Sequence, residues 1–203
     1  MELILASGSA RRRELMENCG YVFSVIKSDA DESLVKEDDP RMLVERLSLL
    51  KAESVFKNLP PERRRNAAVV GSDTVVVLDG SIIGKPHSKE EAKEMLRAES
   101  GKTNVVYTGI AVVTDKNGEA AALVDSDAAS VRFSELTEDE IEAYVNSGEP
   151  MDKAGAYGIQ GSFSMFVEGI EGSYFTVVGL PVHKLYRMLK RTGILPILFH
   201  PAG

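Results

Sequence analysis

The sequence predicts an α/β protein in which helices flank a mixed β-sheet. Two observations support this class: β-branched runs alternate with capped helical segments along the chain, and they do so without the strict β-α-β period of a regular Rossmann fold. The length of 203 residues suits one domain, or one domain divided into two lobes. We therefore expect a single domain over residues 1–203.

Composition and charge exclude several classes of protein. Hydrophobic residues make up 43% and charged residues 27%, close to the averages of globular domains, and the formal net charge is −7. The longest apolar runs, residues 75–78 and 110–113, are far shorter than the roughly 20 residues that a membrane helix needs. An acidic chain also lacks the basic surface that nucleic acids and anionic membranes attract. We expect neither as a partner.

The compartment follows from two further features. The N-terminal residues lack the basic segment and long apolar core of a signal peptide. Cys19 is the only cysteine, so no internal disulfide can form and nothing requires an oxidising environment. The sequence thus predicts a cytoplasmic protein.

The first half of the chain carries clear boundary signals. Asp39-Pro40 opens a long helix, with Asp39 as N-cap and Pro40 at the first helical position. The predicted elements are, in order, a strand at 3–6, a loop at 7–9, a helix from Arg11 to Gly20, a β-rich segment at 21–27, an acidic stretch at 29–32, a helix from Pro40 to about Leu59 and a strand at 69–78.

The second half is delimited by turns and capping boxes. Asp79-Gly80 is the two-residue hairpin signal, and the segments that begin at Ser88 and Thr137 match the reciprocal capping box. The predicted elements are a short strand at 81–84, helices after Ser88 and after Thr137, an antiparallel pair at 105–114 and 121–133, a glycine-rich stretch at 155–179 and a last helix at 181–192.

A candidate anion site lies at the first strand-to-helix turn. Free backbone amides and the helix dipole favour an anion there, and the hydroxyls of Ser7 and Ser9 and the guanidiniums of Arg11 and Arg12 add donors. The turn lacks the spacing of a Walker loop. The alternative is a surface helix that happens to begin with arginines.

Two lysines stand in unusual places. Lys51 lies at i+4 from Leu47 on the apolar stripe of the long helix, so its ammonium needs a partner or water. It either extends past the core to solvent or meets a phosphate or carboxylate in a cleft. Lys85 follows a hairpin between Gly84 and Pro86, where it serves either an anion or solvent.

Acidic residues supply the remaining candidates. Asp73 interrupts an apolar strand, and a buried carboxylate is costly unless it is paired, hydrogen-bonded or bound to metal. A functional role is the favoured interpretation and a structural salt bridge the alternative. Asp29, Asp31 and Glu32 are either solvated loop charges or oxygen ligands for Mg²⁺ or Mn²⁺. Together with the basic groups, these acids suggest metal-assisted phosphate chemistry.

Several segments together resemble the Maf family of nucleotide pyrophosphatases, in the family's order from about residue 3 to residue 190. The most specific is the fifteen-residue block that ends at Gly161. The segments are Ala6-Ser7-Gly8-Ser9-Ala10-Arg11-Arg12, Gly71-Ser72-Asp73-Thr74, Gly84-Lys85-Pro86, Ser100-Gly101-Lys102-Thr103, Ser147 to Gly161, and Val177-Val178-Gly179-Leu180-Pro181.

The resemblance implies an elongated α/β fold with a bent mixed sheet and a central cleft between two lobes, similar to inosine triphosphate pyrophosphatases and often a homodimer. It also implies metal-dependent hydrolysis of a nucleoside triphosphate to the monophosphate and pyrophosphate. The implied roles are phosphate binding by Ser7, Arg11 and Arg12, charge neutralisation by Lys51 and Lys85, metal or water binding by Glu32, a general base and metal contact at Asp73, and base recognition by Gln160.

The joint presence of Arg11, Thr74 and Gln160 is similar to the branch of the family that prefers dTTP and UTP. The chain departs from the family's usual pattern at Ala10, Asn104 and Thr176, where proline, histidine and asparagine are usual. None of these departures removes a charge with an implied catalytic role. The competing hypothesis is a nucleotide-binding regulator of septum formation, which would need the basic groups but no carboxylate that activates water.

Overall fold

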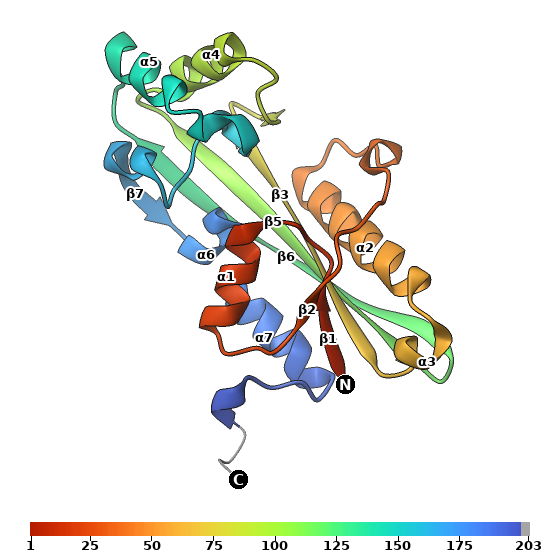
Figure 1. Cartoon of the computed structure of the whole chain (residues 1–203). Coiled ribbons are helices and arrows are strands. Elements are labelled where there is room, and N and C mark those ends of the chain that lie inside the picture. The colour runs from red at the N-terminus through yellow and green to blue at the C-terminus, as the bar shows by residue number, and fades with distance from the viewer. Residues whose placement is uncertain (200–203) are drawn as a thin grey trace. The chain divides into compact units, whose positions relative to one another are not determined.

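The structure, a computed structural model, describes residues 1–199 (Figure 1). Seven strands form one open sheet in the order β2-β1-β3-β5-β6-β7, with β4 paired to β3. The strands are β1 (Glu2–Leu5), β2 (Ser24–Val25), β3 (Ala67–Leu78), β4 (Ser81–Ile83), β5 (Thr103–Lys116), β6 (Glu119–Phe133) and β7 (Val167–Glu171).

The helices lie between these strands in the chain. They are α1 (Ala10–Asn18), α2 (Pro40–Asn58), α3 (Pro61–Arg64), α4 (Lys89–Glu99), α5 (Glu138–Asn146), α6 (Tyr174–Val178) and α7 (Val182–Arg191). Short 3₁₀ helices are η1 (Glu32–Leu34), η2 (Glu149–Asp152), η3 (Ala154–Ala156), η4 (Ser162–Phe166) and η5 (Ile197–Phe199). None of the described helices is long and apolar enough to cross a membrane.

The sheet is mixed, which confirms the predicted class. β1 pairs in parallel with both β2 and β3, whereas β4 pairs with β3 and β7 with β6 in antiparallel fashion. The hairpin after β3 turns at Asp79 and Gly80, both with positive φ as a two-residue hairpin requires. The elongated outline, the bend, the central cleft and the likeness to inosine triphosphate pyrophosphatases stay predictions.

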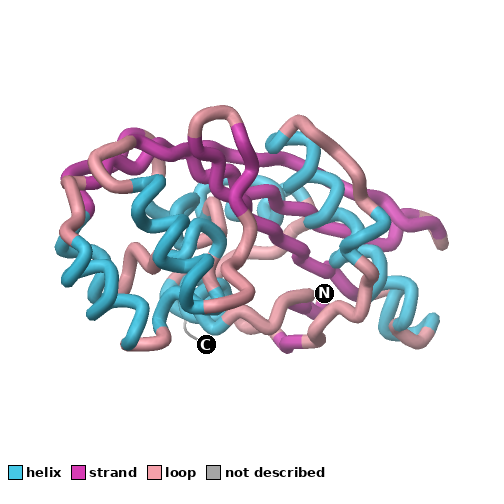
Figure 2. Tube along the Cα trace, turned by 90° about the horizontal axis from the view of Figure 1, so that it is seen from above, coloured by secondary structure: helices cyan, strands magenta, loops and turns pink. Residues whose placement is uncertain are grey.

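The chain divides into two compact units. The first comprises Met1–Asp73, Thr108–Asp127 and the chain from Gly179 onward, and the second comprises Thr74–Tyr107 and Ala128–Val178. Three strands, β3, β5 and β6, contribute residues to both units and are among the long magenta segments of Figure 2.

In the first unit, α2 packs very closely on the sheet. A Cβ atom at Gly71 of β3 would lie 2.1 Å from the carbonyl oxygen of Ser48, and one at Gly109 of β5 would lie 2.2 Å from that of Val44. Only glycine allows this approach. Buried residues of α2 pack against those of β1, β3 and β5 to form the core of this unit, which includes Phe56, Ile4, Val69 and Val113.

The second unit has its own core, built on aromatic side chains. Phe163 is fully buried and its ring contacts those of Phe133, Tyr144, Tyr157 and Phe166. The neighbouring helices α4 and α5 are further joined by two ion pairs on their exposed sides, Lys93–Glu142 and Arg97–Glu138.

Two local expectations need correction. The β-rich segment at 21–27 forms only the two-residue strand β2. The Ser88 hydroxyl does accept from the Glu91 amide at 3.1 Å, but the Glu91 carboxylate accepts from the His87 amide, not from that of Ser88. The reciprocal capping box is therefore complete only at Thr137 and Glu140.

Candidate active site

The predicted anion turn forms as the sequence indicates. Ser9 is the N-cap of α1, and its hydroxyl accepts from the Arg12 amide at 3.4 Å. The Ser7 hydroxyl in turn accepts from the Ser9 amide at 3.2 Å. Both hydroxyls therefore face the positive end of α1.

Arg12 reaches from α1 to the segment that precedes α7. Its Nε donates to the carbonyl oxygen of Gly179 at 2.8 Å, and its Nη1 donates to the Ser7 hydroxyl at 3.3 Å. Burial lowers the pKa of Arg12, while the negative charges of Asp73 and Glu32 act in the opposite direction. A guanidinium keeps its proton in proteins, so this group supplies a fixed positive charge.

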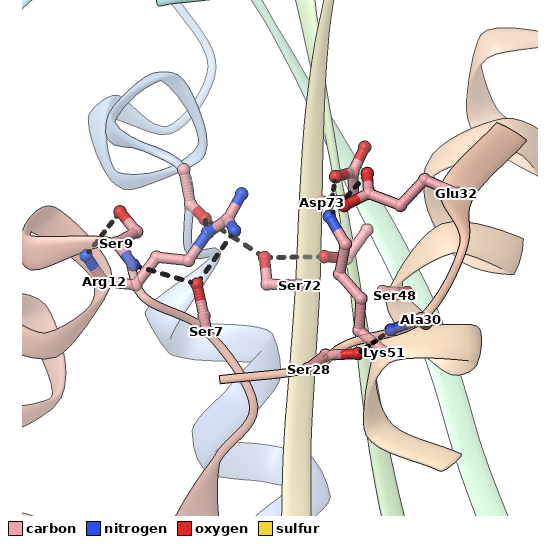
Figure 3. Close-up of polar contacts among 12 residues, drawn as sticks. Ser7, Ser9, Arg12, Ser28, Ala30, Glu32, Ser48, Lys51, Ser72 and Asp73 are labelled. Atoms are coloured by element: carbon pink, nitrogen blue, oxygen red, sulfur yellow. Dashed lines mark hydrogen bonds and ion pairs between the residues drawn. The ribbon is translucent and has the colours of Figure 1, made fainter. Parts of the chain in front are cut away.

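Lys51 joins two carboxylates. Its ammonium lies 2.6 Å from Oδ1 of Asp73 and 3.0 Å from Oε2 of Glu32 (Figure 3). The side chains of Lys51 and Asp73 are only 13% and 12% exposed, whereas that of Glu32 is 52% exposed. The cluster is thus buried at the strand and open to solvent at Glu32.

Strand alternation explains how β3 serves both groups of side chains. Successive residues of a strand point to opposite faces, and Figure 3 shows Asp73 directed toward Lys51 of α2 while Ser72 points the other way. The fully buried Ser72 hydroxyl lies 2.8 Å from the Gly109 carbonyl and 3.1 Å from that of Gly179. The Gly179 carbonyl is therefore shared by Ser72 and Arg12.

The other two acids of the 29–32 stretch point elsewhere. Asp29 accepts from the Ser54 hydroxyl at 2.6 Å. Asp31 is the N-cap of η1 and accepts from both the amide and the hydroxyl of Ser33, contacts that lower its pKa. Of the three acids, Glu32 is the one that meets Lys51.

The remaining predicted residues divide between the two units. Arg11 lies on α1 beside Arg12 in the first unit and is half-buried. Thr74, Lys85 and Gln160 belong to the second unit, in which Lys85 and Gln160 are exposed. Within the described part of the chain, no ion pair holds Lys85.

Sequence reasoning missed two contributors. In the sequence, Ser72 and Gly179 stand out only as parts of longer motifs, although the Gly179 carbonyl accepts from Arg12 and the Ser72 hydroxyl contacts that same carbonyl. A serine inside an apolar strand looks like a packing residue, and a backbone carbonyl leaves no trace in side-chain chemistry. The available signal was Ser72 itself, since a buried hydroxyl requires a partner.

The carboxylates suit a hard cation. Asp73 and Glu32 already converge on one positive group, the Lys51 ammonium, so their oxygens can reach a common centre. Mg²⁺ is typically bound by one or two carboxylates together with substrate phosphates and water. The described residues include no group of three His, Cys, Asp or Glu side chains able to hold a metal.

Comparison with known proteins identifies the family of this chain. The family model described as "Maf-like protein" matches residues 2–192. A relative named "dTTP/UTP pyrophosphatase" from Thermotoga maritima is 50% identical over 193 residues, which cover 95% of this chain and 90% of that protein. Another of the same name from Bacillus anthracis is 46% identical over 194 residues, covering 95% and 96%. This chain belongs to the Maf family.

Proposed function

We propose that this protein is a nucleoside triphosphate pyrophosphatase that hydrolyses dTTP and UTP to the monophosphate and pyrophosphate. The observation that carries the proposal is the convergence of Asp73, Lys51 and Glu32, with both carboxylates close enough to Arg12 for their charges to act on its guanidinium. Two relatives that are 46% and 50% identical to this chain are named "dTTP/UTP pyrophosphatase", and these names support the same reaction and the same substrates.

Binding begins with the polyphosphate. The Ser7 and Ser9 hydroxyls and the guanidiniums of Arg11 and Arg12 offer charge-assisted donors at a helix N-terminus, which suits phosphate oxygens. Lys85 adds a mobile point charge. Because Arg12 is held by Gly179 and Ser7, its guanidinium is oriented before the substrate arrives.

Asp73 is the general base in this proposal. Lys51 binds its Oδ1, which leaves Oδ2 to take a proton from a water molecule. The water oxygen forms a bond to the α-phosphorus, the bond from that phosphorus to the bridging oxygen breaks, and pyrophosphate leaves. Lys51, Lys85 and Arg12 stabilise the charge that develops on the departing group.

Asp73 and Glu32 would also hold the divalent cation, Mg²⁺ or Mn²⁺. When bound, that ion would polarise a phosphoryl oxygen and neutralise charge between the phosphates. Lys51 keeps the two carboxylates close together when repulsion would otherwise separate them.

Base selection is assigned to Gln160, with Thr74 and Arg11. Uracil and thymine present O4 and O2 acceptors around an N3–H donor, and a glutamine amide offers one donor and one acceptor in return. Guanine has a donor amine where uracil and thymine have the O2 acceptor, and adenine has donor and acceptor in exchanged positions. A site built for the whole pyrimidine edge would therefore leave a polar group unpaired with either purine, which costs about 1–3 kcal/mol for each group.

Location and assembly complete the proposal. We place the enzyme in the cytoplasm, as a single domain over residues 1–203 and as a homodimer, with neither nucleic acid nor membrane as a partner. The net charge of −7 supports the exclusion of nucleic acid and membrane, and the single cysteine supports the cytoplasm. Sedimentation at micromolar concentration tests the dimer.

The test of the reaction is pyrophosphate release from dTTP, UTP, CTP, GTP and 7-methyl-GTP, with and without Mg²⁺ or Mn²⁺. We expect kcat/KM for dTTP and UTP to exceed that for GTP by at least about tenfold, the effect of one unpaired polar group. Activity should require the cation. Nucleotide binding without pyrophosphate release would instead favour the regulator, and a preference for a guanine nucleotide would overturn the substrate assignment.

A further inference from the structure

The turn that carries Gln160 encloses a carboxylate. Gln160 is exposed and lies between two glycines, and the Gly161 amide donates to the Gly158 carbonyl at 3.2 Å to close the turn. A Cβ atom at Gly161 would lie 1.8 Å from Oε1 of Glu149, and one at Gly158 would lie 2.6 Å from the same oxygen. Gly161 has an ordinary extended φ of −95°, so it is required for space and not for conformation.

Every contact that the structure gives the Glu149 carboxylate comes from a donor on or beside this turn. Oε2 accepts from the Ser162 amide at 3.2 Å and from the Ser162 hydroxyl at 2.9 Å. Oε1 accepts from the Tyr144 hydroxyl at 3.2 Å, and that hydroxyl accepts from the Gly158 amide at 3.1 Å. Glu149 thus ties down both ends of the turn, one directly and one through Tyr144.

The chemistry of these partners requires a carboxylate. Burial, and then the charge of Glu149, raise the pKa of Tyr144, so the phenol keeps its proton and donates it to Oε1. Three donors therefore converge on two oxygens that can only accept. A glutamine amide has one accepting oxygen, so it would leave one side of the turn without its acceptor.

We infer that Glu149 is a positioning residue for base recognition, which fixes the backbone of Gly158–Ser162 and thereby the direction of Gln160. The inference rests on the proposed role of Gln160. Neither Glu149 nor Tyr144 needs to touch the nucleotide. By holding the turn in one conformation before binding, they reduce the conformational entropy that Gln160 loses when a pyrimidine binds.

The test is a double-mutant cycle with Glu149→Gln, Gln160→Ala and the combination. Each single change should lower kcat/KM for dTTP about tenfold, mainly through KM, because binding of the base is lost while the reacting groups are untouched. The double variant should be no worse than Gln160→Ala within about twofold, and kcat/KM for GTP should fall by less than about twofold in all three. A hundredfold loss in the double variant, or equal losses for dTTP and GTP, would overturn the inference.

Two further variants control for stability and for the loss of charge. Glu138→Gln, on the same helix as Tyr144, removes an ion pair with Arg97 but no contact to the turn, and it should retain the dTTP preference. Gly161→Ala leaves Glu149 intact but places a methyl group where its carboxylate lies, so it should reproduce the loss seen in Glu149→Gln. Normal dTTP preference in Gly161→Ala contradicts the inference.

Amide hydrogen exchange separates this inference from the proposed function. Exchange at Gly158 or at Ser162, on whichever side of the turn loses its acceptor, should accelerate about fivefold in Glu149→Gln, the effect of losing one hydrogen bond. If the wild-type enzyme shows no pyrimidine preference but this acceleration occurs, the substrate assignment fails and Glu149 remains the positioning residue of the turn. Unchanged exchange refutes the positioning role whatever the substrate.

Discussion

At the scale of single residues, the most consequential pair is Asp73 and Lys51. They are 22 positions apart in sequence and 2.6 Å apart in space. The pair explains both residues. The ammonium of the core-facing lysine binds a carboxylate, and the carboxylate in the apolar strand is balanced by that ammonium. It also gives the carboxylate a fixed orientation, which a general base needs.

Asp73→Asn removes the base and one negative charge but keeps the size of the side chain and an acceptor for Lys51. We expect turnover of dTTP to fall at least about 10²-fold, the low end for loss of a general base, while dTTP still binds. Pyrophosphate release and isothermal titration measure the two effects. Near-normal turnover in a folded variant would remove Asp73 from the mechanism.

Glu99 is a second buried carboxyl group, distant in sequence from the proposed catalytic residues. It is fully buried in the second unit, where Asn104 donates to its Oε1 at 2.8 Å, and Oε2 has no hydrogen-bond partner among the described residues. Burial raises the pKa of Glu99 to about 8, and the hydrogen bond from Asn104 acts in the opposite direction. The folded protein therefore holds Glu99 protonated at neutral pH.

This shift predicts how stability depends on pH. The unfolded chain releases the Glu99 proton near its ordinary pKa of 4.5, whereas the folded chain keeps it until about pH 8. Between these values unfolding releases a proton, so stability falls with rising pH, by up to about 1.4 kcal/mol per pH unit from this group. Below pH 4.5 and above pH 8 the contribution is constant.

Glu99→Gln removes that dependence, because the amide does not titrate. Denaturant unfolding at pH 5, 6, 7 and 8 should show the variant gaining stability relative to the wild-type protein at each step. The amide's own hydrogen bonds add a pH-independent offset, so the slope is the quantity to compare. Parallel curves would mean that Glu99 is ionised in the folded protein.

At the scale of secondary-structure elements, the start of α1 invites a stabilising change. Ala10 is the first residue of the helix. The backbone N–H at this position makes no hydrogen bond within the helix, so proline, which lacks an N–H, is favoured there. A proline also restricts the preceding residue to extended conformations, and Ser9 already has φ −69° and ψ 119°. The backbone is therefore compatible with proline.

Ala10→Pro should stabilise the protein by about 0.4–1 kcal/mol, chiefly by restricting the unfolded chain. For a chain of this size, that gain raises Tm by about 1–4 °C. Ala10→Gly serves as the opposite control and should lower Tm, since glycine adds freedom to the unfolded chain. A lower Tm in Ala10→Pro would indicate that the turn differs from the conformation described.

Most elements could be predicted from their local signals. The N-cap Asp39, the capping box at Thr137 and the hairpin turn at Asp79-Gly80 each fixed a boundary to within a residue or two. The segment 21–27 was harder to assign because β-propensity describes fit to a half-buried surface, and only two of its residues pair with a neighbouring strand.

The sites depend on contacts that no local pattern encodes. Lys51 and Asp73 could each be singled out, but their ion pair results from the close approach of α2 to Gly71. Neither Glu99 nor the role of Glu149 within its motif could be predicted, because a glutamate near a helix end is ordinarily a solvated charge. The burial of Glu99 and the enclosure of Glu149 by the Gly158–Ser162 turn arise from tertiary packing.

At the scale of the whole molecule, three strands contribute to both compact units. β3 passes from the first unit to the second after Asp73, β5 passes from the second to the first after Tyr107, and β6 returns after Asp127. Neither unit can therefore unfold without disturbing hydrogen-bonded strands of the other. We expect cooperative, two-state unfolding of residues 1–199.

Phe163→Leu tests this expectation from the second unit. Phe163 is fully buried among four aromatic rings, so the smaller side chain should destabilise the protein by about 1–2 kcal/mol. If unfolding is cooperative, calorimetry shows one transition at a lower temperature, and the calorimetric and van't Hoff enthalpies agree. The most protected amides of β1, which belongs to the first unit, should exchange faster by the same factor as those of the second unit, about 5- to 30-fold. Two separate transitions, or unchanged protection in β1, would show instead that the two units unfold independently despite the strands they share.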